Sequence, residues 1–368
     1  MKKFLIRTVI SLGIGALMLW LAAREISFDG VWGALKAANW LYVLPYLGLM
    51  AVQHIFRAWR WGFLLAPVQP VPFSRILPIS SVGFFAILAL PLRMGEFVRP
   101  YLIADPPKLR MSHGLGTMAV ERVFDGLILA LGAWVAVAIA ETRTTVPEWV
   151  EAAGFIALVV FLTALVVLVM TLWQRERAVL ICRRLVGIIS PKLAERAAGI
   201  ARGVVEGFRV LPDWRRLLPF LFGTAAYWVG NAAAIWVLAK GFDLNMTFGA
   251  ATAFIALVGI GIMIPAGPGF VGNYEFFAKG AMGLYIQKHV SESVAAAFIV
   301  TSHATNALWY IGAGLVAMLS PEITFKKVWT VSTSSEQLDD VSPSGEQPTQ
   351  TSAPPPPSTG TPAANTDA

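Results

Sequence analysis

Six long apolar runs recur along the chain, and each approaches the length of about 20 residues that an α-helix needs to cross the hydrocarbon core of a bilayer. The runs are residues 4–23, 41–56, 117–140, 149–173, 217–239 and 294–319. Charged residues make up only 14% of the sequence, whereas soluble domains carry about a quarter. The chain is therefore predicted to be an all-α, polytopic membrane helix bundle. The first run is expected to stay as an anchor, because it is longer than the apolar part of a signal peptide and lacks an A-x-A-like site.

Two further apolar stretches are broken near their middle by proline and glycine. Residues 76–90 are followed by Pro91, and residues 250–264 are followed by Pro265. Broken helices are tolerated at membrane depth only where protein or a watery cavity surrounds them. Both stretches are therefore predicted to form re-entrant hairpins. Their expected hinges are Pro91, Gly95, Pro265, Gly267, Gly269 and Gly272.

Loop charges predict how the chain crosses the membrane, since cytoplasmic loops carry an excess of lysine and arginine. This rule places Arg57, Arg60, Arg75 and Lys108 in the cytoplasm, together with both termini. Arg75 and Lys108 share a side only if the first hairpin enters and leaves by the same face. Residues 141–148 then lie outside, and the second hairpin enters from the outside. We therefore expect a multi-pass protein of the cytoplasmic (inner) membrane.

This topology implies an inverted repeat of two broken-helix hairpins. The first hairpin is followed by a helix that carries Glu121, Arg122 and Asp125, and the second by a helix that carries His303 and Asn306. Inverted repeats with discontinuous helices are typical of secondary transporters, whose sites lie at the repeat interface near the membrane midplane.

The segment between the two halves and the end of the chain differ from the rest in composition. Residues 174–216 interleave arginines with apolar side chains, which predicts one or two amphipathic helices on the inner leaflet, broken near Pro191. They are either a connector held by anionic lipid or a device that gathers lipid headgroups. Residues 1–328 are assigned to the membrane domain, and residues 329–368, rich in Ser, Thr and Pro, to a disordered cytoplasmic tail.

The sequence contains no motif of the common catalytic sites. It has no Walker A loop, no H-E-x-x-H and no G-x-S-x-G. The four histidines and the single cysteine, Cys182, are scattered, so neither a metal site nor a cofactor is predicted. We therefore expect no enzymatic activity. The net charge of +7 is attributed to loops that face anionic lipid and not to nucleic-acid binding.

Ionisable residues at membrane depth form the candidate site, because they are costly there and are functional by default. Arg93, Glu96 and Arg99 are three residues apart and are predicted to line one face of a half-helix that starts near Arg93. Glu96 would neutralise one arginine and leave the other for a phosphate, which a guanidinium group binds bidentately. Alternatively, all three pair internally and hold the hairpin closed.

Glu121, Arg122 and Asp125 are too costly for a surface that faces lipid. They are expected to point into the bundle, toward Arg93 and Arg99. Either they form a structural ion network or they belong to a transport path.

The second break carries its own candidates. Asn273 and Glu275 stand at the start of a new half-helix, whose positive dipole end suits an anion, although Glu275 could instead cap that helix. His303 and Asn306 lie one helical turn apart. The histidine either titrates during function or is a neutral, hydrogen-bonded core residue.

Three motifs occur in a characteristic order: PLRMGEFVRP at residues 91–100, ERVFD at residues 121–125, and PAGPG at residues 265–269 followed by Glu275. In this order they resemble the flippase-like transmembrane region of the lysylphosphatidylglycerol synthase family, over nearly all of residues 1–319. The resemblance implies a membrane region that flips aminoacylated phospholipid between leaflets. The full-length synthase also has an aminoacyl-transferase domain, which the sequence after the last helix does not match. Lysyl transfer is therefore not expected, and the lipid need not be lysylphosphatidylglycerol.

Two classes of function stay open. The first is a lipid flippase or transporter for a phospholipid or other anionic lipid, in which Arg93 and Arg99 engage a phosphate and the two hairpins are moving gates. The second is a non-transporting membrane partner that regulates a lipid or glycan assembly enzyme through the basic segment or the tail. In both cases membrane lipids with anionic headgroups are the expected partners, and the oligomeric state is left open.

Overall fold

The computed structural model of the protein describes residues 2–24, 26–105, 108–141, 148–264, 267–285, 291–321 and 323. The regular structure of these residues is helical, which confirms the predicted all-α class. The α-helices are α1 (Lys2–Ala23), α2 (Phe28–Ala37), α3 (Val43–Leu65), α4 (Phe73–Ala89), α5 (Val98–Ile103), α6 (Met111–Glu141), α7 (Glu148–Trp173), α8 (Arg175–Gly187), α9 (Pro191–Glu206), α10 (Trp214–Gly241), α11 (Phe248–Met263), α12 (Asn273–Tyr285) and α13 (Glu292–Ala317). Four 3₁₀ helices join them: η1 (Trp40–Tyr42), η2 (Pro91–Phe97), η3 (Gly207–Val210) and η4 (Pro268–Phe270).

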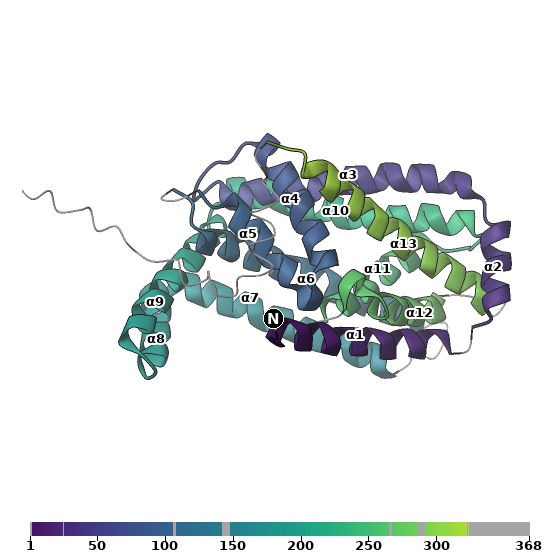
Figure 1. The fold of residues 1–368 in the computed structure, drawn as a ribbon, viewed down its shortest axis with the longest axis horizontal. Coiled ribbons are helices and arrows are strands. Elements are labelled where there is room, and N and C mark those ends of the chain that lie inside the picture. The colour runs from purple at the N-terminus through teal and green to yellow at the C-terminus, as the bar shows by residue number, and fades with distance from the viewer. Residues whose placement is uncertain are drawn as a thin grey trace, which may run out of the picture.

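Each of the six predicted apolar runs lies mainly within one long helix: α1, α3, α6, α7, α10 or α13. Among the described helices, α7, α10 and α13 are long and apolar enough to cross a bilayer, and α2 with the following η1–α3 segment gives a fourth candidate span, bent by 75°. Figure 1 shows the long helices packed as a bundle, with α3 and α10 side by side along one edge. The fold is therefore that of an integral membrane helix bundle.

The first broken stretch forms a hairpin of α4, η2 and α5. The helix α4 ends at Ala89, where Leu90 turns to an extended conformation before Pro91. The chain then packs back against α4, so closely that a Cβ atom on Gly95 would overlap the backbone of Ala86. At the open end, Arg75 Nη1 lies 3.6 Å from Asp105 Oδ2. The stretch therefore enters and leaves at the same end of the bundle, as the sequence predicts.

The second broken stretch forms a similar hairpin of α11, η4 and α12. Asn273, at the start of α12, donates to the Gly261 carbonyl of α11 over 3.2 Å, so the two arms are joined near the break. The turn requires glycine at Gly272, because its φ is +90° and a Cβ atom there would overlap the Gly15 carbonyl of α1. Pro265 lies outside the described residues, so its role as a hinge stays a prediction.

The two hairpins enter the bundle from opposite ends. The helices α3 and α10 run antiparallel, because Asn39, just before α3, donates to the Gly241 carbonyl at the end of α10 over 2.8 Å. The first hairpin therefore starts near the end of α3 and the second near the end of α10, which is the other end of the bundle. Their tips meet where Arg93 Nη1 donates to the Ile262 carbonyl over 2.6 Å. This arrangement confirms the predicted inverted repeat.

The basic segment forms two helices, α8 and α9, and Pro191 is the first residue of α9, as predicted. They pack together as a helical hairpin that projects from one end of the bundle in Figure 1, with an ion pair between Arg183 and Glu195. His113 Nε2 lies 2.9 Å from Glu206 Oε2, which fastens α9 to the start of α6. The tail and most of the 141–148 loop lie outside the described residues.

The expectation that Arg57 and Arg60 belong to a cytoplasmic loop is wrong. Arg57 and Arg60 interrupt the apolar run after Phe56, but the helix α3 continues to Leu65. Arg60 is fully buried, and Arg57 faces the interior of the bundle. Carboxylates of α6 supply the countercharge that allows Arg60 to lie there.

Candidate functional site

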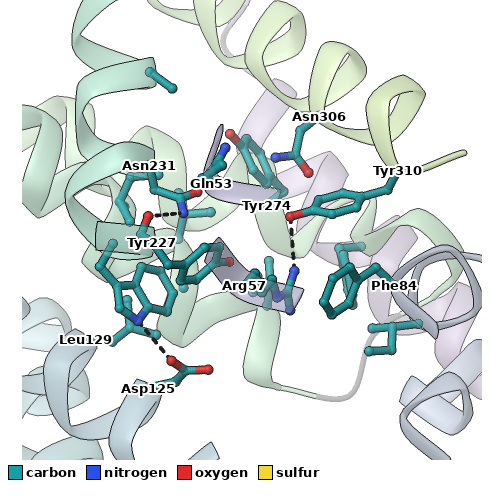
Figure 2. A pocket seen from close by; sticks show the side chains of 18 of the residues that line it. Gln53, Arg57, Phe84, Asp125, Leu129, Tyr227, Asn231, Tyr274, Asn306 and Tyr310 are labelled. Carbon is teal, nitrogen blue, oxygen red and sulfur yellow. Dashed lines mark hydrogen bonds between the residues drawn. The ribbon is translucent and has the colours of Figure 1, made fainter. Parts of the chain in front are cut away.

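A central cavity of about 120 Å³ lies between the two halves of the bundle (Figure 2). Both hairpins contribute to its wall, with Arg93 from the first tip and Phe270 from the second. The remaining wall comes from α3, α4, α6, α10 and α13. Its position at the interface of the repeats is the place where transporters with inverted repeats bind their substrates.

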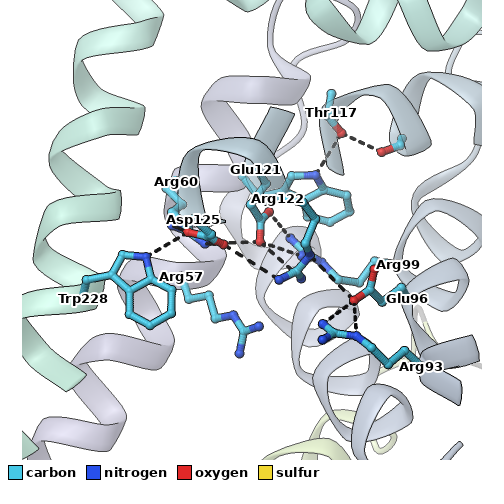
Figure 3. Close-up of polar contacts among 12 residues, drawn as sticks. Arg57, Arg60, Arg93, Glu96, Arg99, Thr117, Glu121, Arg122, Asp125 and Trp228 are labelled. Atoms are coloured by element: carbon cyan, nitrogen blue, oxygen red, sulfur yellow. Dashed lines mark hydrogen bonds and ion pairs between the residues drawn. The ribbon is translucent and has the colours of Figure 1, made fainter. Parts of the chain in front are cut away.

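Behind this cavity, two buried arginines hold two buried carboxylates (Figure 3). Arg60 of α3 donates to both oxygens of Asp125 over 2.7 and 2.8 Å, and to Glu121 over 3.3 Å. Arg99 of α5 donates to both oxygens of Glu121 over 3.2 Å each. The carboxylates of α6 thus fasten α3 and the first hairpin together, and both arginines make the bidentate pairs that suit a planar guanidinium group.

Arg57 has a different environment from the arginines behind the wall. It lines the cavity, donates to the Tyr310 hydroxyl over 3.0 Å, and has its guanidinium carbon 3.9 Å from the centre of the Phe84 ring. Among the described residues, no carboxylate oxygen lies within 4.0 Å of its guanidinium nitrogens, so Arg57 forms no ion pair there. Its buried Nε also has no hydrogen-bond partner among the described residues. Arg57 therefore presents a positive charge to the cavity.

Arg122 also lines the cavity and is only loosely paired. Its nitrogens lie 3.8 Å from Glu96 and 3.9 Å from both Glu121 and Asp125. Two of these nitrogens, Nε and Nη2, are buried without a hydrogen-bond partner in the described structure. Arg122 thus brings to the cavity wall a guanidinium group whose contacts with the described carboxylates are long.

The whole cluster carries an excess of positive charge. Its arginines are Arg57, Arg60, Arg93, Arg99 and Arg122, and its carboxylates are Glu96, Glu121 and Asp125. Five guanidinium groups thus face three carboxylates among the described residues. A buried excess of this kind is costly unless an anion offsets it.

The tip of the first hairpin is locked by Arg93. Its Nη2 lies 2.5 Å from Glu96 Oε1, while its Nη1 donates to Ile262 of the other hairpin. The φ of Arg93 is +58°, in the left-handed region that non-glycine residues rarely adopt. The half-helix does not start near Arg93 as expected but at Val98, because η2 intervenes.

The second hairpin also carries a charged residue near its tip, Glu275. Glu275 accepts from the backbone N–H of Gly272 over 2.7 Å, which confirms that it caps α12. The same carboxylate lies 2.5 Å from His303 Nδ1, and His303 Nε2 lies 2.7 Å from the Gly269 carbonyl. His303 also stacks on Tyr274 with ring centres 4.3 Å apart. Glu275 and His303 thus join the second hairpin to α13, as Arg99 and Glu121 join the first hairpin to α6.

The family model for the lysylphosphatidylglycerol synthase TM region matches residues 8–314. The chain belongs to this family. No curated protein matches the chain. Membership of the lysylphosphatidylglycerol synthase TM family supports a role connected with membrane lipids, and the match spans both hairpins and the whole central cavity.

Within this member of the family, the predicted site residues separate into two groups. The residues that line the central cavity are Arg93, Arg122, Asp125, His303 and Asn306. The residues outside its wall are Glu96, Arg99, Glu121, Asn273 and Glu275, all of which make contacts within the protein. A role of either group in binding substrate stays a prediction.

A second cavity, of about 380 Å³, lies between α1, α2, α12 and α13. Its lining is mainly apolar, with Lys279 and Glu275 among the exceptions. Because Glu275 lines this cavity and its partner His303 lines the central one, the pair forms part of the wall between them.

Sequence reasoning missed Arg57 and Gln53, both of which line the central cavity. The signal was their spacing: Gln53, Arg57 and Arg60 are four and three residues apart, which places them on one face of a helix. The apolar residues that continue from Trp61 to Leu65 indicate the same extension of α3.

Proposed function

We propose that the protein moves a lipid with a phosphate-bearing headgroup between the leaflets, and that the headgroup passes through the central cavity. The observation that supports this proposal most strongly is the positive charge of Arg57 and Arg122, which both line the cavity. Among the described residues, Arg57 has no carboxylate partner and Arg122 has only long contacts with carboxylates. A phosphodiester carries the negative charge and the several acceptor oxygens that two guanidinium groups require.

The two hairpins supply the elements that would move. Their tips meet at the cavity through Arg93 and Ile262, and each tip is entered from the opposite end of the bundle. Separation of the tips from one side or the other would expose the cavity to one leaflet at a time, as in other inverted-repeat transporters.

The test is a leaflet-resolved assay with the purified full-length protein in liposomes that contain fluorescent phospholipid. Arg57→Gln and Arg122→Gln are each expected to slow protein-dependent lipid movement by about tenfold or more, because a hydrogen bond to a charged group contributes about 1.5–3 kcal/mol. Arg215→Gln is the matched control, since Arg215 is an exposed arginine in the first turn of α10 and does not line the cavity.

Equal rates for the wild-type protein, Arg57→Gln and Arg215→Gln would contradict the proposal. If no lipid moves in any of them, the alternative role as a non-transporting partner of a lipid or glycan assembly enzyme is favoured. Circular dichroism and thermal unfolding of each variant separate loss of function from loss of fold.

A further inference from the structure

Two amide side chains, Gln53 and Asn306, border the central cavity. Gln53 is 1% exposed, and its Oε1 has no hydrogen-bond partner among the described residues. Its Nε2 contacts only the thioether of Met50, and Asn306 Nδ2 lies 3.9 Å from the same sulfur atom. A thioether is a weak acceptor. Gln53 is therefore an unsatisfied polar group in a buried site, whereas the half-buried Asn306 also has a side-chain hydrogen bond with Tyr46.

Their position relative to Arg57 divides the cavity into two zones. Gln53 lies one helical turn before Arg57 on α3. Figure 2 shows Gln53 and Asn306 close to Tyr274, on the side of the cavity away from Asp125. One zone thus offers guanidinium groups, and the other offers neutral donors and acceptors.

The described residues that line the cavity offer no free countercharge to a cation. The carboxylate that lines it among the described residues is Asp125, and its two oxygens already accept from Arg60 over 2.7 and 2.8 Å. Trp228 Nε1 donates to Asp125 as well, over 3.0 Å. An ammonium group in this cavity would meet Arg57 and Arg122 and would find no unpaired carboxylate.

We infer that the cavity selects a phospholipid whose phosphate is esterified to an uncharged group with hydroxyls. Arg57 and Arg122 hold the phosphate, and Gln53 and Asn306 exchange hydrogen bonds with the hydroxyls. Headgroups that carry an amine, including aminoacylated ones, are disfavoured. This inference rests on the proposed function and adds to it the chemical class of the headgroup.

The test measures lipid binding, so that it does not depend on transport. Native mass spectrometry of the full-length protein in detergent compares four lipids with identical acyl chains: phosphatidylglycerol, phosphatidylmethanol, phosphatidylethanolamine and lysylphosphatidylglycerol. Phosphatidylglycerol and phosphatidylmethanol have the same charge and differ in hydroxyls. For the wild-type protein we expect phosphatidylglycerol to bind about tenfold more tightly than each of the other three, which corresponds to about 1.4 kcal/mol.

The variants assign that preference to the amides. Gln53→Leu and Asn306→Leu are expected to bind phosphatidylglycerol and phosphatidylmethanol equally, while Asn245→Leu, at an exposed asparagine, keeps the wild-type ratio. Gln53→Leu is also expected to keep or raise the melting temperature, because it replaces an unsatisfied buried amide by an apolar side chain of similar size. If Gln53 instead stabilised the fold, Gln53→Leu would lower the melting temperature.

The outcomes separate this inference from the proposed function. Equal binding of phosphatidylglycerol and phosphatidylmethanol by the wild-type protein, or tighter binding of either amine lipid, overturns the headgroup preference and leaves the proposed function standing. An unchanged ratio in both leucine variants overturns the role of the amides. Failure to bind any of the phospholipids overturns the proposed function itself, and the inference with it.

Discussion

Arg57 and Arg60 lie three residues apart on α3 and have opposite surroundings. Arg60 is fully buried and makes a bidentate pair with Asp125. Arg57 borders the cavity, donates to the Tyr310 hydroxyl and lies over the Phe84 ring, and no described carboxylate forms an ion pair with it. One turn of α3 thus carries two arginines, of which Arg60 is structural and Arg57 is a candidate binding residue.

This difference predicts opposite effects of the same substitution. Arg60→Met is expected to lower stability by about 3–5 kcal/mol, because it leaves buried carboxylates without their partner. Arg57→Met is expected to keep the melting temperature and lose lipid movement. Thermal unfolding followed by size-exclusion chromatography measures the first effect, and the liposome assay measures the second.

The double variant Arg60→Met/Asp125→Leu should recover most of the lost stability, since the buried acid is removed as well. No recovery would argue against the pairing of Arg60 with Asp125.

Arg99→Lys tests whether Arg99 recognises substrate or holds the first hairpin. Lysine keeps the charge but loses the fork that reaches both oxygens of Glu121. Because Arg99 lies outside the cavity wall, we expect a lower melting temperature and an unchanged headgroup preference. A normal melting temperature with an altered headgroup preference would instead place Arg99 on the substrate path, as its sequence motif suggests.

Gly95→Ala is expected to open the first hairpin. The added Cβ would overlap the backbone of Ala86, and backbone atoms of a helix have little room to move. Overpacking of this kind costs about 1–3 kcal/mol. Gly48→Ala in α3 is the control, since nothing in the described structure lies within 4 Å of a Cβ at that position. We expect Gly48→Ala to leave the melting temperature unchanged or raise it, and equal behaviour of the two variants would refute the close packing.

Cysteine labelling tests the orientation of the hairpins in a membrane. In a Cys182→Ala background, single cysteines at Arg75 and Lys108 are expected to react from the same side, and one at Asp243 from the other. Asp243 follows α10 at the opposite end of the bundle. Reaction of positions 75 and 108 from different sides would exclude a re-entrant first hairpin.

The segment after Val331 is expected to be dispensable. It is rich in Ser, Thr and Pro and lacks the apolar residues needed for a core. Truncation there should leave membrane insertion and lipid movement unchanged, as measured by fractionation and by the liposome assay. A loss of lipid movement at normal expression would identify the tail as a regulatory or partner-binding element.

Much of the fold could be predicted because its signals are local. A proline and a glycine mark the break in each hairpin, and the basic loops predict on which side of the membrane each segment begins and ends. The pairing of Arg75 with Asp105 confirms the same-end entry that this reasoning requires. Pro191 likewise marks the boundary between the two helices of the basic segment.

The charged site was harder to predict because its pairs join distant segments. Arg60 and Asp125 are separated by 65 residues, and nothing near Arg60 in the sequence indicates a countercharge. An arginine at the end of an apolar run therefore looks like a loop residue. The prediction that the half-helix starts near Arg93 is wrong for a related reason. Arg93 has a left-handed backbone, which is stabilised by Glu96 and by Ile262 of the other half of the chain.

The order of the charges along the chain has a consequence for biosynthesis. Arg57, Arg60, Arg93 and Arg99 leave the ribosome before Glu121 and Asp125, with Glu96 as the acid among them. Each unpaired arginine at the centre of a membrane helix costs about 2.5–3.5 kcal/mol. Arg60 and Arg99 find their carboxylate partners on α6, so we expect the nascent first half to gain much of its stability in the bilayer only after α6 is inserted.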